Sequence, residues 1–342
     1  MILITGASGH LGANLAGALA TKGAPLRLLL RPGTNRACLE GIKAEVTEGS
    51  VTDFVACQRA MRGIRQVYHC AAQISTHHRA PDDIFQTNVI GTANILRAAA
   101  QAGVDRVVVT GSLSATGHRA DRPTDESELF NPLESHLPYA FTKAAVEHEC
   151  LRAVAEGQNV VIAVSCAILG PRDFKPSRMG SVLIRFARRR LLAYVPGGFE
   201  FVAARDIVQG HLLAMERGER GQKYIFSTRF ASFDEIMAIF SDVTGQPKPP
   251  LRLPPNLMKA VAHIVEPAMT LFLPGMPQLL TPAAIRLLQM GRRADCAKAS
   301  DRLGYRPTDL GAAIEEAYGW FVERGVIAPA KRHYTAPRGR RL

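Results

Sequence analysis

Short apolar runs alternate with amphipathic stretches along the first 165 residues of the chain. The runs that predict β-strands are 2–5, 26–30, 44–49, 66–71, 106–111 and 160–166. Helical patterns lie between most of them, and two of these, 11–23 and 88–103, end in Gly, as helices often do. Apolar strands separated by helices are typical of a parallel sheet that helices cover on both faces. We therefore predict an α/β fold with a doubly wound parallel sheet.

The composition of the sequence changes after residue 170. Proline and glycine become common, and short helical patterns lie between them together with one more strand-like run, 222–227. This composition favours a smaller lobe built from insertions on the sheet. We predict a main domain over 1–170 and a smaller mixed substrate lobe over 171–330, from which strand 222–227 returns to the sheet. A basic tail follows over 331–342.

Composition and charge exclude several classes of protein. A hydrophobic content of 47% with 21% charged residues is that of an ordinary globular chain. The net charge of +12 is concentrated in the runs 185–190, 291–293 and 331–342. We interpret these runs as solvated surface, with attraction to a phosphorylated ligand or an anionic surface as the alternative. They lack interleaved aromatic residues and any nucleic-acid-reading motif, so we predict no nucleic-acid partner.

Cysteine spacing and hydropathy bear on metal binding and location. The six cysteines form no CxxC pair and no metal-ligand spacing, so we predict buried thiols in a reducing compartment and no metal. The N-terminus runs straight into an apolar strand pattern, without the features of a signal peptide. Charged residues and prolines interrupt the most apolar stretch, 257–276. We expect a soluble cytoplasmic protein without a transmembrane segment.

A glycine-rich turn follows the first predicted strand. Gly6, Gly9 and Gly12 stand three residues apart in TGASGHLG, between that strand and the first predicted helix. A turn this tight needs residues without a β-carbon, and a pyrophosphate then approaches the backbone N–H groups at the helix N-terminus. The turn therefore predicts a dinucleotide-binding Rossmann domain. The binding residues are predicted to be Gly6, Ser8, Gly9, His10, Leu11 and Gly12.

The end of the second strand indicates which dinucleotide binds. An acidic residue there would accept hydrogen bonds from a ribose 2′-hydroxyl, whereas an arginine pairs with a 2′-phosphate. Arg31 stands at that point with Arg36 nearby, and the first acidic residue is Glu40. A guanidinium attracts the phosphate and a carboxylate repels it. The sequence therefore favours NADP(H), with NAD(H) as the alternative.

A tyrosine and a lysine stand four residues apart in a later helical pattern. Tyr139 and Lys143, in YAFTK, would lie on one helix face, one turn apart. Aromatic residues and lysines often share a helix face by chance. Taken alone, the pair therefore does not establish a function, and the rest of the chain must decide.

Together these motifs resemble an extended short-chain dehydrogenase/reductase of the NAD-dependent epimerase/dehydratase superfamily. The resemblance rests on the glycine turn, HCAA, TNVIGT, VVTGSLSATG and YAFTK, and it covers nearly the whole chain. Within the family the chain is most similar to dihydroflavonol reductase-like and 3β-hydroxysteroid dehydrogenase-like members. The combination is specific for the superfamily and much less specific for the substrate.

The resemblance implies catalytic roles for three residues. Tyr139 would exchange a proton with the substrate oxygen, and the charge of Lys143 would lower the pKa of the phenol. Lys143 would also bind the nicotinamide ribose. Ser112 would donate a hydrogen bond to the substrate oxygen, with Ser114 as the competing serine.

The resemblance also extends the predicted cofactor site and shows two departures. Ala71 and Ala72 would line the adenine side. Where the family often has Asp, this chain has Ser50, followed by Val51, so the hydrogen bond to adenine is in doubt. Where the family commonly has a proline beside the nicotinamide, this chain has Cys166, which we expect to pack there without acting as a nucleophile.

Two enzymatic functions compete. The first is NADP-dependent interconversion of a secondary alcohol and a ketone on a hydrophobic small molecule. The second is a nucleotide-sugar epimerase or reductase that uses the same three residues; arginines such as Arg178 would then hold a diphosphate. The candidate substrate residues are Ser114, His77, Cys166 and Arg178. A non-catalytic NADP-binding protein is a third hypothesis, which the intact residues disfavour. Relatives often pair through the tyrosine-bearing helix, so a homodimer is possible.

Overall fold

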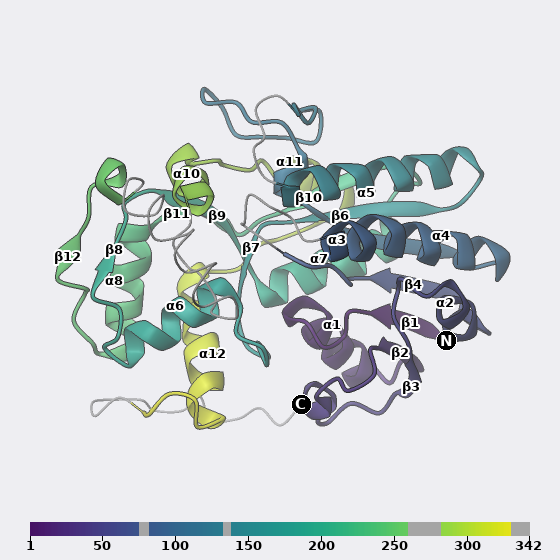
Figure 1. Ribbon diagram of the computed structural model, residues 1–342, viewed down its shortest axis with the longest axis horizontal. Coiled ribbons are helices and arrows are strands. Elements are labelled where there is room, and N and C mark those ends of the chain that lie inside the picture. The colour runs from purple at the N-terminus through teal and green to yellow at the C-terminus, as the bar shows by residue number, and fades with distance from the viewer. Residues whose placement is uncertain (75–81, 133–137, 259–281, 330–342) are drawn as a thin grey trace.

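The structure is a computed structural model of the whole chain, and it describes residues 1–74, 82–132, 138–258 and 282–329. Its main element is a parallel sheet with the strand order β10-β6-β5-β4-β1-β2-β3. The strands are β1 (Ile2–Thr5), β2 (Leu26–Leu30), β3 (Glu45–Glu48), β4 (Gln66–His69), β5 (Arg106–Ser112), β6 (Val160–Ser165) and β10 (Lys223–Phe226). The predicted Rossmann-type doubly wound sheet is confirmed (Figure 1).

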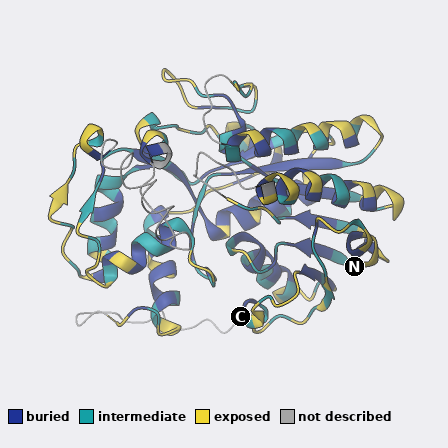
Figure 2. Ribbon diagram, viewed as in Figure 1, coloured by how far each residue is buried: buried dark blue, intermediate teal, exposed yellow. Residues whose placement is uncertain are grey.

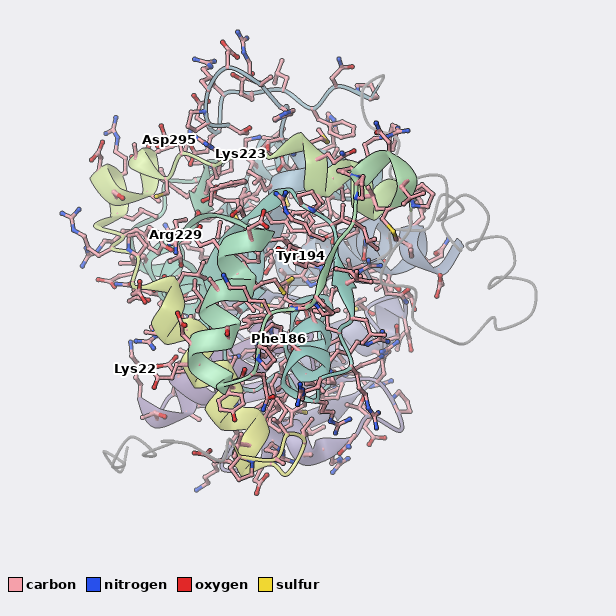
Figure 3. All side chains as sticks on the ribbon, turned by 90° about the vertical axis from the view of Figure 1, so that its left-hand side faces the viewer. Lys22, Phe186, Tyr194, Lys223, Arg229 and Asp295 are labelled. Atoms are coloured by element: carbon pink, nitrogen blue, oxygen red, sulfur yellow. The ribbon has the colours of Figure 1, made fainter. Side chains whose placement is uncertain are left out.

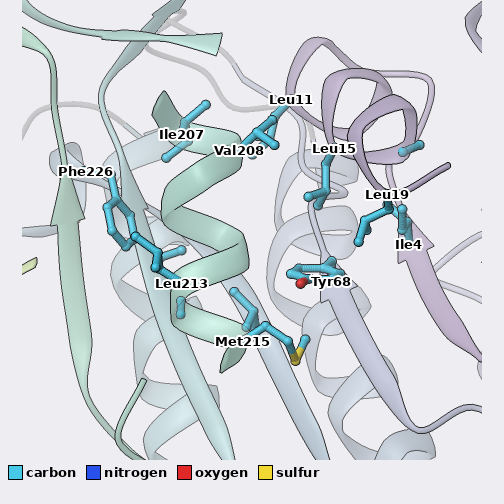
Figure 4. Close-up of a cluster of buried hydrophobic side chains, with 14 of the residues drawn as sticks. Ile4, Leu11, Leu15, Leu19, Tyr68, Ile207, Val208, Leu213, Met215 and Phe226 are labelled. Atoms are coloured by element: carbon cyan, nitrogen blue, oxygen red, sulfur yellow. The ribbon is translucent and has the colours of Figure 1, made fainter. Parts of the chain in front are cut away.

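Helices cover both faces of this sheet. The first layer is α1 (His10–Thr21), α7 (Ala204–Arg217) and α11 (Ala297–Leu303). The second layer is α2 (Phe54–Met61), α4 (Gly91–Gln101) and α5 (Pro138–Ala155). Figure 4 shows the first core, where Leu15 and Tyr68 pack with residues of α7. Both side chains are at most 2% exposed, and burying a leucine of this kind stabilises the fold by about 1.5–3 kcal/mol.

A smaller part of the molecule lies beside the carboxyl ends of the sheet strands (Figure 1). It contains a mixed sheet of β7 (Ala167–Leu169), β9 (Gly198–Ala203) and β11 (Arg229–Ser232), and a pair of β8 (Ala193–Tyr194) and β12 (Leu251–Arg252). Its helices are α6 (Arg178–Ala187), α8 (Phe233–Thr244), α10 (Pro282–Met290) and α12 (Leu310–Glu323).

The smaller part has a hydrophobic core of its own. Phe186 of α6 meets Phe240 of α8 edge to face, with ring centroids 5.5 Å apart, and residues of α12 complete the cluster. At its rim the Tyr194 hydroxyl donates to Asp234 at 2.7 Å. Figure 3 views this part of the molecule, with Phe186 and Tyr194 labelled. Segments 204–226 and 297–305 lie instead on the main sheet, so the predicted boundary at residue 170 stays a prediction.

Local structure departs from the sequence pattern in one helix. The pattern predicts a continuous helix over 88–103, but the structure places a π-helix, η2 (Gln86–Ile90), before α4. A short α3 (Asp82–Phe85) precedes it, and single 3-10 turns, η1 (Arg36–Leu39) and η3 (Leu113–Ala115), follow β2 and β5. Buried residues concentrate on the sheet and on the inward faces of the helices (Figure 2). Within the described residues, no helix is long and apolar enough to span a membrane.

Candidate active site

The glycine turn joins β1 to α1, and two of its glycines stand where a β-carbon has no room. Gly6 has a φ of +73°, and a β-carbon on it would lie 2.6 Å from the backbone nitrogen of Ala71. A β-carbon on Gly12 would lie 2.3 Å from the carbonyl oxygen of Gly6. No side chain caps α1 at its N-cap residue, Gly9. The first N–H groups of the helix are therefore available to an anion, which fits a dinucleotide pyrophosphate.

A segment of the smaller part is fixed against this turn. The imidazole Nε2 of His10 lies 3.0 Å from the carbonyl oxygen of Pro171, and Asn14 donates to the same oxygen at 2.8 Å. The Nδ1 atom of His10 is buried and has no hydrogen-bond partner among the described residues. Ser8 and Leu11 belong to the same turn and first helical residues, so the six predicted glycine-turn residues lie together.

The residues predicted to line the adenine side follow the ends of β3 and β4. Ala71, whose N–H donates to Thr5 Oγ1 at 3.3 Å, follows β4 closely, and Ala72 comes next. The Ser50 hydroxyl is 2.8 Å from the hydroxyl of Thr52 and accepts the N–H of that residue, so it is hydrogen-bonded within the turn that follows β3. Val51 is buried.

The two arginines predicted to select the cofactor differ in their surroundings. Arg31 is exposed and lines a pocket of about 410 Å³ together with Ser8, Thr34 and Asn35. Arg36 forms an exposed ion pair with Glu48 at 2.8 Å and does not line that pocket. The structure therefore brings Arg31, and not Arg36, to the glycine turn.

The serine and the tyrosine meet at the carboxyl end of β5. Ser112 is the last residue of that strand, and Tyr139 is the second residue of α5, after Pro138. Proline suits this first helical position because its fixed φ is helical and it has no N–H to leave unpaired. The Ser112 hydroxyl is hydrogen-bonded to Tyr139 and lies 2.8 Å from the Ser114 hydroxyl. Ser112 therefore contacts the phenol, with Ser114 behind it.

Burial acts on the pKa of Tyr139 in the direction opposite to the expected lowering. Burial raises the pKa of Tyr139, and the hydrogen bond from Ser112 offsets only part of that rise. The ammonium of Lys143 donates to the carbonyl oxygen of Thr110 at 2.6 Å, and the role of its charge in lowering the pKa of the phenol stays a prediction. Lys143 is 4% exposed, and burial lowers its own pKa to about 8.

Asn88 ties the segment after β4 to the tyrosine-bearing helix. Its amide accepts the N–H of Gln73 at 2.7 Å and donates to the carbonyl of the same residue at 3.0 Å. The same amide nitrogen donates to Thr142, which in turn donates to the carbonyl of Tyr139. The side chain of Asn88 is therefore fully paired and holds the start of α5 in place.

His211 is a residue that sequence reasoning missed, and it supports Lys143. Its Nδ1 lies 2.8 Å from the carbonyl oxygen of Ile207, which makes Nδ1 the donor and Nε2 an acceptor. The Thr110 hydroxyl, 2.9 Å away, then donates to Nε2, while the carbonyl of Thr110 holds Lys143. Burial lowers the pKa of His211 to about 4. The sequence signal was a histidine on the apolar face of α7.

His211→Leu is expected to flatten the acid dependence of stability. In the unfolded chain this histidine binds a proton below about pH 6.5, whereas in the folded protein buried His211 binds it only near pH 4. The free energy of unfolding therefore decreases as the pH falls through this window. The wild type should lose about 1.4 kcal/mol per pH unit more than the variant. Urea unfolding between pH 7 and 4.5 measures this, with exposed His148→Leu as the control. Equal slopes for wild type and His211→Leu would contradict the assignment.

Arg292 is a second residue that sequence reasoning missed. Its guanidinium donates to the carbonyl oxygen of Leu113, next to Ser112, and burial lowers its pKa. Among the described residues it forms no ion pair with a carboxylate. The expectation that the run 291–293 is solvated surface is therefore wrong for this residue. The charge of Arg292 acts to lower the pKa of the Cys166 thiol. Burial has the larger and opposite effect and raises this pKa well above its usual value, so the thiol stays protonated.

The remaining predicted substrate residues are not all placed. Arg178 is the first residue of α6, after the N-cap Ser177, and burial lowers its pKa. His77 lies outside the described residues, as do most of the apolar stretch 257–276 and the basic tail.

Comparison with known proteins decides the family. The model of the NAD dependent epimerase/dehydratase family matches residues 2–226. The chain belongs to this family. Among curated members it is 37% identical to the sterol demethylase protein B of Methylococcus capsulatus, over 95% of this chain and 99% of that protein. It is 31% identical to a putative dihydroflavonol 4-reductase of Synechocystis, over 95% of each chain.

A solved structure extends the family likeness. The crystal structure of gox2253 superposes with a TM-score of 0.82 at 29% identity, covering 96% of this chain and 99% of that one. The resemblance to extended short-chain dehydrogenases/reductases is thereby confirmed, and the protein is an NAD(P)-dependent oxidoreductase of this type.

Proposed function

We propose that the protein is an NADP-dependent oxidoreductase that interconverts a secondary alcohol and a ketone on a hydrophobic small molecule. The observation that carries this proposal is that Ser112 and Tyr139 meet at the end of β5, in the same sheet whose strand β1 leads into the glycine turn. The names of the relatives support a hydrophobic substrate, because one is a sterol demethylase protein and another acts on a farnesyl quinoline. Cytoplasmic location and a homodimer belong to the same proposal.

Each of the three residues would have a separate role in the reaction. A bound nicotinamide would supply or accept the hydride at the carbinol carbon. Ser112 donates a hydrogen bond to the oxygen as negative charge develops on it, and Tyr139 transfers the proton. Because burial raises its pKa, the phenol is protonated at neutral pH and is suited to donate a proton. Lys143, held by Thr110, would bind the ribose.

The cofactor preference rests on Arg31. Its guanidinium is exposed at the end of β2, beside Ser8 of the glycine turn, and Glu40 is the first acidic residue after it. A 2′-phosphate at that position would pair with the guanidinium.

A nucleotide-sugar epimerase or reductase is the second candidate function. Arg292 favours it, because this guanidinium lies beside Ser112 without a carboxylate partner among the described residues. A diphosphate in the substrate would supply the missing anion. The same charge would also accommodate a carboxylated hydrophobic substrate, so Arg292 does not decide between the two.

Substrate panels separate the two functions. We expect oxidation of NADPH with hydrophobic ketones, including 3-keto sterols, and no interconversion of UDP- or GDP-sugars. Arg292→Gln should then leave neutral ketones largely unaffected. Epimerisation of a nucleotide sugar without net NADPH consumption, abolished by Arg292→Gln, would contradict the first function and support the second.

A further inference from the structure

The pocket that contains Arg31 has a second wall, which comes from the smaller part of the molecule. One wall is the glycine turn and the segment after β2, with Ser8, Arg31, Thr34 and Asn35. The opposite wall is contributed by Phe174, Lys175, Trp320 and Arg324. The glycine turn and α12 are thus brought together across a space of about 410 Å³.

Three cationic groups face this space. Arg31 and Lys175 are exposed, and neither forms an ion pair within the part of the chain that the structure describes. The Arg324 guanidinium lies against two rings, 5.1 Å from the centroid of Phe174 and 5.8 Å from that of Trp320. One of its nitrogens pairs with Glu40 at 2.9 Å, and its other N–H donors have no partner within the described residues, so a ligand could accept them.

The acidic residues nearby do not cancel this charge. Asp173 also lines the pocket, but it is 2% exposed and accepts the N–H of Ser177 at the start of α6. Glu40 takes a single nitrogen of Arg324 and is otherwise exposed. Like charges around a shared space repel one another, and a dianionic phosphate relieves that repulsion through charge-assisted hydrogen bonds. The pocket therefore fits a phosphomonoester.

We propose that Lys175 and Arg324 complete a 2′-phosphate site across from Arg31, so that the smaller part of the molecule also binds the 2′-phosphate of the cofactor. The inference rests on the proposed NADP preference and adds two specificity-determining residues to it. The location supports this ligand, because the ribose of a dinucleotide lies where β2 ends beside the glycine turn. Asn35 contributes its amide N–H groups, since its oxygen already accepts the N–H of Ala37.

The tryptophan in this wall makes the proposal testable without turnover. Trp320 is the single tryptophan of the chain, so its emission reports on this pocket. We expect 2′,5′-ADP to change that emission and to bind more tightly than ADP, with Kd values measured by calorimetry. Arg324→Gln and Lys175→Gln should each weaken 2′,5′-ADP binding about tenfold and leave ADP binding unchanged.

Arg205→Gln is the matched control. It removes an ion pair with Glu316 of the same helix α12, but Arg205 does not line the pocket, so both affinities should be retained. If Arg31→Gln weakens 2′,5′-ADP binding while Arg324→Gln and Lys175→Gln do not, the inference fails and the NADP preference stands. If 2′,5′-ADP and ADP bind equally to the wild type, the preference and the inference both fail.

Discussion

Tyr139→Phe is expected to lower kcat for ketone reduction about 10³-fold while leaving the Kd for NADPH unchanged. The substitution removes one hydroxyl and keeps the ring, so the packing at the start of α5 is preserved. What is lost is the proton donor and the hydroxyl that Ser112 holds in place. Steady-state kinetics gives kcat, and NADPH fluorescence titration gives the Kd.

Tyr194→Phe is the matched control for this loss. Tyr194 also has a paired hydroxyl, which donates to Asp234 at 2.7 Å, but it lies in the β8–β12 pair of the smaller part. Its removal should leave kcat close to that of the wild type, because Tyr194 pairs with Asp234 and with none of the predicted catalytic residues. Tyr139→Phe turnover equal to that of Tyr194→Phe would remove Tyr139 from the proton-transfer role.

Gly6→Ala is expected to weaken NADPH binding by at least about 100-fold and to destabilise the fold. The new β-carbon would lie 2.6 Å from the nitrogen and 2.7 Å from the α-carbon of Ala71, and both are backbone atoms that cannot rotate away. The turn and the end of β4 must therefore separate, which displaces the N–H groups of α1 from the pyrophosphate. A positive φ adds about 1–2 kcal/mol of strain.

Gly23→Ala isolates the effect of the positive φ. Gly23 has a φ of +71°, close to that of Gly6, but a β-carbon on Gly23 would meet no atom within 4 Å beyond its chain neighbours. The variant should lose about 1–2 kcal/mol of unfolding free energy and keep its affinity for NADPH. Thermal unfolding and fluorescence titration of both variants make the comparison. Equal NADPH affinities for the two variants would show that the turn does not hold the cofactor.

The parallel sheet was predictable because each of its strands is marked locally. The run 222–227 indicated β10 from its apolar and aromatic residues, although the chain leaves the sheet for nearly sixty residues before it. The mixed sheet of β7, β9 and β11 was not predicted. Pro171, Pro176 and Pro196 interrupt the pattern around its strands, so periodicity carries little information there.

The candidate site was predictable where its residues share a motif and unpredictable where they meet across the fold. Tyr139 and Lys143 stand one helical turn apart and Ser112 ends a strand, so the family resemblance could assign roles to all three from their motifs. Arg292 reaches Leu113 across 179 residues, and His211 reaches Thr110 across 101. No sequence pattern links such pairs. The raised pKa of Tyr139 depends on burial, which the motif does not reveal.

The central claim is that hydride from a dinucleotide on the glycine turn reaches a carbon whose oxygen is held by Ser112 and Tyr139. Isotope transfer tests it most directly. NADPH deuterated at one C4 position, and separately at the other, is incubated with the enzyme and a hydrophobic ketone. The account predicts that one of the two labelled forms yields an alcohol with deuterium on its carbinol carbon, and that Tyr139→Phe abolishes this product. Alcohol free of deuterium from both forms, or no alcohol from any ketone, would contradict it.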